Sequence, residues 1–528
     1  MEQQILIYDT TLRDGTQGEQ ISFSAEEKLR IAQKLAELGI HYIEGGWPGS
    51  NPKDMRFFQM AKKSKVEPAR LTAFGSTRRA NTMAGKDSNL EALLQAETKT
   101  LAIFGKSWDL HVNEILGISL EENLAMILDS VSLLKSHNKE VIYDAEHFFD
   151  GYRANPDYAF KTIQAAITGK ADIIVLCDTN GGTMVSDVED IVKMVTKSFP
   201  HTSLGIHAHN DCGLAVANSL AAVGAGATMV QGTINGYGER CGNADLISVI
   251  GNLQLKLGRK CLEDSKIKHL TEVSRYVSDI ANIPPLNERP FVGRSAFSHK
   301  GGMHVSAILK EPKAYEHIEP GTVGNKRRVL VSDLSGKSNI EYKAKEMDLA
   351  LGGNGYDSKK IVEEIKRMED QGYQFDAAEG SLELLIKRTT GQFKEPFSLL
   401  SLRVINEKNK QGHFMSQATI KISVGEEEEI NAAEGNGPVN AIDNALRKAL
   451  SKFYPAIKEM RLVDFKVRVL EGSAGTGARV RVLIESMDGK DIWNTIGVSE
   501  NIIEASWQAL VDSIYFKLSK GKTSEQTE

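Results

Sequence analysis

The sequence predicts an α/β fold: a (β/α)8 TIM barrel, followed by helical linker subdomains and a C-terminal α+β domain. Residues 1–250 repeat a short apolar segment, a loop and an amphipathic helical pattern, which is typical of a parallel sheet. The repeat occurs eight times, and eight units favour a closed barrel. A doubly wound open sheet is the alternative, but no Gly-x-Gly-x-x-Gly turn follows the first apolar segment.

The expected strands are short apolar runs bounded by polar loops. They cover residues 5–8, 42–44, 71–74, 101–104, 141–143, 173–176, 204–206 and 229–231. Between them, apolar residues recur at the spacing of a helix face, for example at Leu29, Ala32, Leu35 and Ala36. The expected helices cover residues 25–38, 121–135, 156–168, 185–197 and 213–223, with a shorter one at 91–98.

The pattern changes after the eighth unit, where Pro284, Pro285 and Pro290 interrupt the helical periodicity. Helices are expected at 358–370, 378–387, 439–452 and 502–518, and strands at 400–405, 418–424, 462–470 and 479–485. The expected domains are the barrel over 1–270, the linker subdomains over 271–395 and the α+β domain over 396–528. The acidic run 426–429 and the basic run 326–328 are expected to be solvated turns.

Composition excludes several classes of protein. A chain of 528 residues is long enough for two or three domains, and 41% hydrophobic with 25% charged residues is ordinary for a globular protein. A net charge of −6 predicts no general attraction to nucleic acid or to an anionic membrane surface. The four cysteines lack zinc-finger spacing and are too few for a disulfide scaffold, which favours a reducing, cytoplasmic setting.

Polar residues that could bind a ligand or take part in catalysis follow six of the eight expected strands. They stand in the segments Asp9–Gln17, Glu44–Gly49, Asp144–His147, Cys177–Gly182, His207–Asp211 and Asn235–Ala244. Active sites of such barrels lie at the C-terminal ends of the strands. These six segments are therefore expected to form one rim.

The histidine pair on this rim indicates a metal site. His207 and His209 close the seventh strand, and residues two apart in a strand point to the same side. Two neutral imidazoles so placed can bind a divalent cation, although a hydrogen-bonded pair without metal is the alternative. Asp14 would add a carboxylate and Asn243 an amide oxygen. This mixed donor set predicts a divalent metal ion (Mn²⁺, Zn²⁺, Co²⁺ or Mg²⁺) and does not choose among the four.

Arg13 stands next to the expected ligand Asp14. Its guanidinium stays charged and can stabilise a developing oxyanion; the alternative is that it only neutralises the rim carboxylates. A metal ion and an arginine that polarise one oxygen suit a carbonyl electrophile. The site therefore suggests carbon–carbon bond chemistry on a 2-oxo acid.

The motifs together resemble a known family. They are Asp9-Thr10-Thr11-Leu12-Arg13-Asp14-Gly15, His207-x-His209, Gly238-Glu239-Arg240-x-Gly242-Asn243-Ala244, Gly301-Gly302-Met303-His304 and Gly435-Asn436-Gly437-Pro438-Val439. This combination resembles the 2-isopropylmalate, homocitrate and citramalate synthases, metal-dependent condensing enzymes with a TIM barrel. The loop 44–54, which contains Trp47, is similar to one citramalate synthase branch, which implies pyruvate as the acceptor. The alternative is 2-oxoisovalerate, as in the 2-isopropylmalate synthases.

The resemblance implies a role for each matching residue. Asp14, His207 and His209 would ligate the metal with Asn243 nearby, Arg13 would bind the keto oxygen, and Thr179 would meet the substrate carboxylate. Glu146 would be catalytic, together with His304 and Tyr315 from the linker subdomain of the other subunit of a homodimer. A base, expected to be His304 tuned by Glu146, would deprotonate acetyl-CoA, and the enolate would attack pyruvate before the thioester is hydrolysed. His299 is a weaker candidate for the base.

Two further expectations follow from the resemblance. The C-terminal domain would be regulatory, pair across the dimer and bind isoleucine as a feedback inhibitor. The glycine-rich segments 435–437 and 472–477 would line its pocket or else be tight turns. In the barrel, Phe74 and Phe104 stand at strand ends and would supply the bulk that excludes a larger acceptor than pyruvate, if they face inward.

Overall fold

The computed structural model describes residues 4–64, 66–349, 358–408, 410, 412–470, 472–489 and 491–520. The chain divides into two compact units, Met1–Phe297 with Ile318–Lys326, and Ser298–His317 with Arg327–Glu528. Each unit is described by itself. No helix within the described ranges is long and apolar enough to span a membrane.

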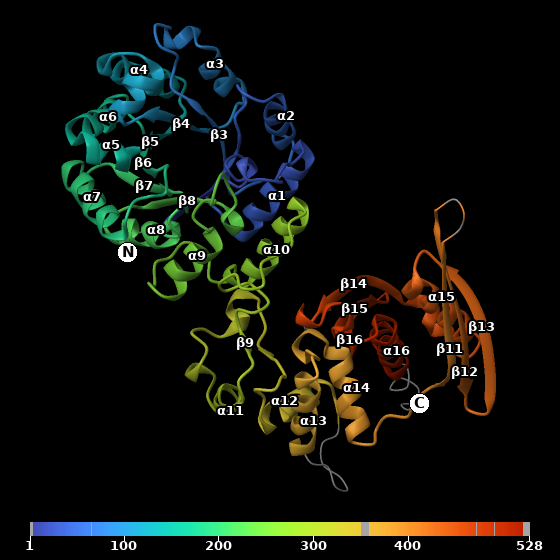
Figure 1. Cartoon of the computed structure of the whole chain (residues 1–528). Coiled ribbons are helices and arrows are strands. Elements are labelled where there is room, and N and C mark those ends of the chain that lie inside the picture. The colour runs from blue at the N-terminus through green and yellow to red at the C-terminus, as the bar shows by residue number, and fades with distance from the viewer. Residues whose placement is uncertain are drawn as a thin grey trace. The chain divides into compact units, whose positions relative to one another are not determined.

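The first unit is a closed barrel of eight parallel strands, coloured blue to green in Figure 1, so the predicted fold is confirmed. The strands are β1 (Leu6–Asp9), β2 (Tyr42–Gly46), β3 (Arg70–Ser76), β4 (Thr100–Lys106), β5 (Glu140–Glu146), β6 (Ile173–Asp178), β7 (Ser203–Ala208) and β8 (Met229–Gly232). Each strand pairs with its neighbour in sequence, and β8 pairs with β1 to close the ring. The C-terminal ends of all eight strands therefore meet at one rim.

Helices surround the barrel on its outer face (Figure 1). They are α1 (Ala25–Leu38), α2 (Pro52–Ala61), α3 (Ser88–Gln95), α4 (Leu120–Ser136), α5 (Phe148–Ala154), α6 (Pro156–Thr168), α7 (Val185–Ser198), α8 (Ala215–Gly224), α9 (Leu246–Leu255) and α10 (Leu270–Ala281). Four of these, α2, α5, α9 and α10, were not expected from the sequence. The signal for α2 was local, because Asn51 caps the backbone N–H of Lys53 and Pro52 occupies the first turn.

The apolar core has two layers. Side chains on the outer face of the strands pack against the helices, with Ile7, Ile43, Leu101, Ile174 and Ile206 fully buried. A smaller cluster fills the barrel interior and includes Tyr8, Phe74, Ile142, Val175 and Met229. This filled interior closes the barrel below the rim, so polar side chains at the strand ends rest on a packed base.

The second unit begins with a two-stranded parallel sheet, β9 (Ser298–His299) and β10 (Arg328–Val329), and helix α11 (Gly302–Lys310). Helices α12 (Lys337–Glu346), α13 (Ser358–Asp370) and α14 (Glu379–Thr389) follow. The basic run 326–328 is not a solvated turn, because Arg328 belongs to β10 and Arg327 forms an ion pair with the buried Glu316 at 2.6 Å.

Two antiparallel three-stranded sheets complete the second unit, drawn in orange and red in Figure 1. One contains β11 (Ser398–Lys408), β12 (Phe414–Val424) and β13 (Glu427–Gly435), and the other contains β14 (Arg461–Val469), β15 (Val480–Met487) and β16 (Ile492–Ser499). Helix α15 (Pro438–Leu450) packs on the first sheet and α16 (Ile502–Lys520) on the second.

Strands β13 and β16 were not expected from the sequence. The acidic residues 427–429 open β13, so the prediction of a solvated turn is wrong there. Charged side chains are tolerated in this strand because it lies at the edge of its sheet.

Candidate active site at the barrel rim

A cavity of about 200 Å³ opens at the C-terminal ends of the barrel strands. It is lined by Arg13, Asp14, Gln17, Trp47, Phe74, Phe104, Asp144, Glu146, Cys177, Thr179, His207, His209, Glu239 and Arg240. These residues come from the loops after strands β1 to β8 and from the strand ends themselves. The structure thus gathers the rim residues of the barrel, as the fold predicts.

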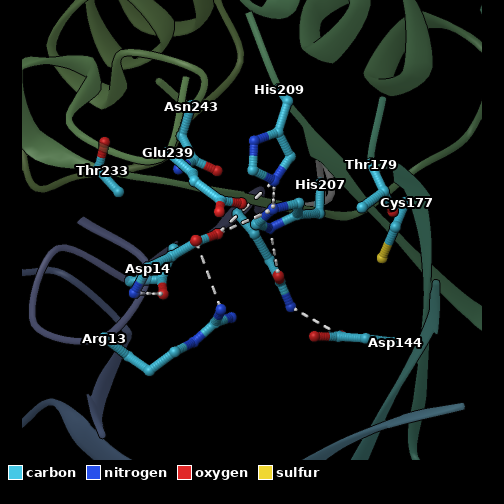
Figure 2. A network of polar contacts seen from close by, with 12 residues as sticks. Arg13, Asp14, Asp144, Cys177, Thr179, His207, His209, Thr233, Glu239 and Asn243 are labelled. Atoms are coloured by element: carbon cyan, nitrogen blue, oxygen red, sulfur yellow. Dashed lines mark hydrogen bonds and ion pairs between the residues drawn. The ribbon is translucent and has the colours of Figure 1, made fainter. Parts of the chain in front are cut away.

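Three potential metal ligands converge at one end of this cavity (Figure 2). The Nε2 atoms of His207 and His209 lie 3.2 Å apart, and Asp14 Oδ2 lies 3.3 Å from the first and 3.8 Å from the second. Two nitrogens bound to one ion at about 2.0–2.1 Å lie roughly 3.0–3.4 Å apart. The spacing therefore suits a shared cation.

The surroundings of this cluster also fit a metal ion. Asn243 is buried and its Nδ2 donates to the carbonyl of Tyr237 at 3.1 Å, which leaves Oδ1 buried with no hydrogen-bond partner among the described residues. Asn243 lies beside His209 and Glu239 in Figure 2. A buried amide oxygen without a partner is costly, and a cation would satisfy it. Two imidazoles, a carboxylate and an amide oxygen form a donor set suited to a divalent ion.

Burial and neighbouring charges shift the pKa values of these three side chains. Burial would raise the pKa of Asp14, but Arg13 and the two histidines outweigh it and hold that pKa well below its ordinary value. Burial lowers the pKa of His209 to about 4, so this imidazole is neutral near pH 7. Burial also opposes protonation of His207, yet its contact with Asp14 prevails and raises its pKa. Asp14 is thus anionic and His209 offers a lone pair.

Arg13 is held beside the cluster by a buried carboxylate. Its Nε donates to Glu44, and its Nη1 lies 3.5 Å from Asp14 Oδ1. Glu44 is fully buried and also accepts hydrogen bonds from the hydroxyls of Tyr8 and Thr10. The role of Glu44 in fixing Arg13 was not recognised in the sequence; the available signal was a glutamate at the end of an apolar strand.

Three aromatic side chains form a wall of the cavity. The rings of Trp47, Phe74 and Phe104 pack on one another with centroids 5.6–5.7 Å apart. Phe74 and Phe104 thus face the cavity, as the argument about acceptor size requires.

The position of Trp47 is fixed by polar contacts that the sequence alone did not suggest. Its indole Nε1 donates to Asn89 Oδ1 at 2.7 Å, and its backbone N–H donates to Asp54 Oδ2 at 2.9 Å. Asp54 is in turn paired with Lys28, whose ammonium is buried beneath the loop and also donates to the carbonyl of Gly45. The wall is therefore rigid at its polar edge.

Glu146 and Thr179 both line the cavity. Glu146 forms an ion pair with Lys106 from the end of β4. Thr179 Oγ1 accepts a hydrogen bond from the backbone N–H of His147 at 2.9 Å, so its hydroxyl hydrogen remains to be donated elsewhere. Lys106 was not singled out from the sequence.

His304 and Tyr315 belong to the second unit. His304 lies on α11 and Tyr315 follows the short helix Pro312–Ala314, and their rings stack with centroids 4.2 Å apart. Within the described residues, neither lines the barrel cavity. His299 pairs with Glu316 at 3.2 Å. Within the second unit, the structure therefore brings His304 and Tyr315 together.

Family models match nearly the whole chain. The HMGL-like model matches residues 4–277, the homocitrate synthase post-HMGL domain-like model matches 291–373, and the LeuA allosteric (dimerisation) domain model matches 376–518.

Curated relatives match over the same length. The chain is 57% identical to an (R)-citramalate synthase of Geobacter sulfurreducens, with 99% of each chain covered. It is 55% identical to an (R)-citramalate synthase of Aquifex aeolicus, with 98% of this chain and 99% of that one covered. A 2-isopropylmalate synthase of Pseudoalteromonas atlantica is 32% identical over 97% of this chain and 95% of its own length. With the metal-ligand cluster at the barrel rim, these matches show that the chain belongs to the HMGL-like family of metal-dependent condensing enzymes and, within it, to the (R)-citramalate synthases.

Proposed function

We propose that this chain catalyses a Claisen-type condensation of acetyl-CoA with pyruvate and hydrolyses the thioester, giving (R)-citramalate and CoA for isoleucine biosynthesis. The observation that carries the proposal is one cavity that holds a metal-ligand cluster, a fixed arginine and an aromatic wall. Relatives named (R)-citramalate synthase at 46–57% identity support it. We assign catalysis to residues 1–270, completion of the partner subunit's site to 271–395, and regulation to 396–528.

Asp14, His207 and His209, with Asn243, would hold the divalent ion. When bound, the ion would act as a Lewis acid on the ketone and carboxylate oxygens of the acceptor. Mn²⁺, Zn²⁺, Co²⁺ and Mg²⁺ all suit this donor set. The four are separated by adding each to metal-free protein and measuring the rate of thiol release.

The chain's own residues then orient the acceptor. Arg13, fixed by Glu44, faces the keto oxygen and stabilises the negative charge that develops there. Thr179 donates its remaining hydroxyl hydrogen to the acceptor carboxylate, because its Oγ1 already accepts from the backbone of His147.

The aromatic wall sets the size of the acceptor. Trp47, Phe74 and Phe104 leave room for the methyl group of pyruvate and oppose the isopropyl group of 2-oxoisovalerate. The alternative function, a 2-isopropylmalate synthase, requires that larger acceptor. The 2-isopropylmalate synthase of Pseudoalteromonas atlantica is less similar to this chain, at 32% identity.

Proton transfer falls to groups outside the metal cluster. Glu146 and His304, with Tyr315, would remove the methyl proton of acetyl-CoA; the enolate carbon would then bond to the ketone carbon of pyruvate. Water would next attack the thioester carbonyl, the C–S bond would break, and CoA would leave as the thiol. His304 and Tyr315 lie in the second unit, which fits a homodimer in which each second unit completes the partner's barrel.

The C-terminal domain supports a regulatory role. It matches a family model described as an allosteric dimerisation domain, and we infer isoleucine as its ligand. If isoleucine neither inhibits the enzyme nor shifts its melting temperature, this part of the proposal fails.

A direct test of the function combines metal-free protein, acetyl-CoA and pyruvate. Thiol release that depends on added divalent ion, with citramalate identified by chiral chromatography and mass spectrometry, is the expected result. Absence of citramalate under every metal would overturn the proposal.

A further inference from the structure

Gln231 is a buried polar residue behind the metal-ligand cluster. It lies on β8, where the backbone register places it directly opposite His207 on β7, and none of its surface is exposed. An amide buried among apolar side chains destabilises the fold unless it is fully hydrogen-bonded. Its partners therefore indicate why an amide stands here.

Both ends of the Gln231 amide are engaged. Oε1 lies 2.9 Å from His207 Nδ1, and Nε2 donates to Asp144 Oδ1 at 3.1 Å. Asp144 comes from β5, which is not a neighbour of β8 in the sheet, so this hydrogen bond crosses the barrel interior. Asp144 is buried and lies on the opposite side of the cluster from Asn243 (Figure 2).

This arrangement determines which nitrogen of His207 is free. The NH₂ of Gln231 donates to Asp144, whose ionised carboxylate only accepts, and this turns Oε1 toward His207. Oε1 also only accepts, so Nδ1 of His207 must carry a hydrogen. In the neutral imidazole the lone pair is then on Nε2, the atom that faces Asp14 and His209.

His209 provides a contrast within the same cluster. Its Nδ1 is buried and has no hydrogen-bond partner among the described residues. Of the two histidines, His207 is therefore the one whose Nδ1 is hydrogen-bonded, through Gln231, to Asp144. Asp144 also lines the acceptor cavity, so the chain connects the cavity wall to the metal-ligand cluster.

We propose that Gln231 and Asp144 are positioning residues that lock His207 in its metal-binding tautomer and orientation. Metal-bound histidines usually donate their second ring N–H to a carboxylate, a backbone carbonyl or water; here the amide of Gln231 takes that place and is itself held by Asp144. The proposal rests on the proposed function in one respect, that Asp14, His207 and His209 hold a divalent ion.

The test measures the affinity of metal-free protein for Mn²⁺. Electron paramagnetic resonance gives the concentration of free Mn²⁺ at each point of the titration. Gln231→Met keeps the side-chain length and removes both hydrogen bonds, and we expect Mn²⁺ affinity to fall about 10- to 100-fold. Gln231→Glu keeps an acceptor for Nδ1–H but loses the donor to Asp144, so it is expected to recover only part of that loss.

Cys177→Ala is the matched control. Cys177 lies on β6 and pairs with His207 on the side of β7 that faces away from Gln231. Its thiol donates to the carbonyl of Val175 and not to His207. Its removal is expected to leave Mn²⁺ affinity within about twofold, since no hydrogen bond to His207 is lost.

Unchanged Mn²⁺ affinity in Gln231→Met would overturn the proposal. If that variant does not fold, the ¹⁵N shifts of histidine in the Zn²⁺-loaded wild-type protein decide: a protonated Nδ1 on His207 supports the proposal and a protonated Nε2 overturns it. Failure of the wild-type protein to bind any of the four divalent ions would instead overturn the metal site of the proposed function.

Discussion

The guanidinium carbon of Arg13 lies 3.7 Å from the centroid of the Phe74 ring. The same side chain is anchored at Nε by the buried Glu44 and lies close to Asp14. Arg13 therefore joins the two ends of the cavity, with the metal-ligand cluster on one side and the aromatic wall on the other. We expect both the chemistry and the selectivity of the site to depend on these contacts of Arg13.

Arg13→Lys tests the role of the guanidinium. Lysine keeps the charge but cannot donate to Glu44 and lie flat on Phe74 at the same time. We expect kcat with pyruvate to fall by about 10²–10³, the usual effect of losing one donor to a developing oxyanion. Mn²⁺ affinity should change little.

Arg153→Lys serves as the control for that change, because Arg153 pairs with Asp187 on the surface. Full activity of Arg13→Lys would show that Arg13 only balances the rim carboxylates.

Phe104→Ala tests the aromatic wall. Removing one ring from the Trp47, Phe74 and Phe104 group makes space for an isopropyl group. The ratio of kcat/KM for 2-oxoisovalerate to that for pyruvate should rise by about 10- to 200-fold, the range that one methylene group contributes in an apolar pocket.

A matched control is Phe160→Ala, which removes a ring that packs with Tyr152 and Phe199, none of which lines the cavity. It should lower stability and leave the ratio unchanged. An unchanged ratio in Phe104→Ala would remove the wall from the account of selectivity.

His304→Ala should retain Mn²⁺ and pyruvate binding, while its rate of condensation should fall by about 10² or more, the magnitude typical of a lost general base.

The location of His304 in the second unit allows a sharper experiment with mixed dimers. Asp14→Asn and His304→Ala are each expected to be inactive alone. If His304 acts across the dimer, a heterodimer of the two contains one intact site and regains activity. Continued inactivity of purified heterodimers would show that His304 does not serve the partner's barrel.

The raised pKa of the buried Asp9 predicts that the stability of the protein depends on pH. Burial raises the pKa of Asp9 to about 7 from an ordinary value of 3.8, against the hydrogen bonds from Thr11 that favour the ionised form. Between these values the folded protein binds a proton that the unfolded chain has lost, so the contribution of Asp9 to stability declines as pH rises through this range.

Asp9→Asn mimics the protonated side chain. The difference in urea midpoint between pH 5 and pH 8 should therefore be smaller in this variant than in the wild type. Asp157→Asn, an exposed carboxylate on α6, should leave that difference unchanged. An equal pH response in wild type and Asp9→Asn would contradict the assignment.

The barrel could be predicted because its signals are local. Each strand is an apolar run, and the closure of eight parallel units brings Asp14, His207 and His209 to one rim without any knowledge of distances. The supporting residues could not be predicted in the same way. Glu44 and Gln231 acquire their roles from partners 31 and 24 residues away in sequence, through hydrogen bonds that only the closed barrel creates.

The second unit was harder to predict for a related reason. Strand β13 begins with charged residues, and its place at a sheet edge overrides the local preference for a turn. His304 and Tyr315 carry no local signal of catalysis beyond the resemblance, because the barrel residues they are proposed to serve lie in the other unit.

We propose that this cavity selects pyruvate as the acceptor of an acetyl group. The most direct measurement is kcat/KM for a panel of 2-oxo acids with acetyl-CoA and saturating Mn²⁺, followed by thiol release. We predict the highest value for pyruvate and a steep decline toward 2-oxoisovalerate. A higher kcat/KM for 2-oxoisovalerate than for pyruvate would contradict the account.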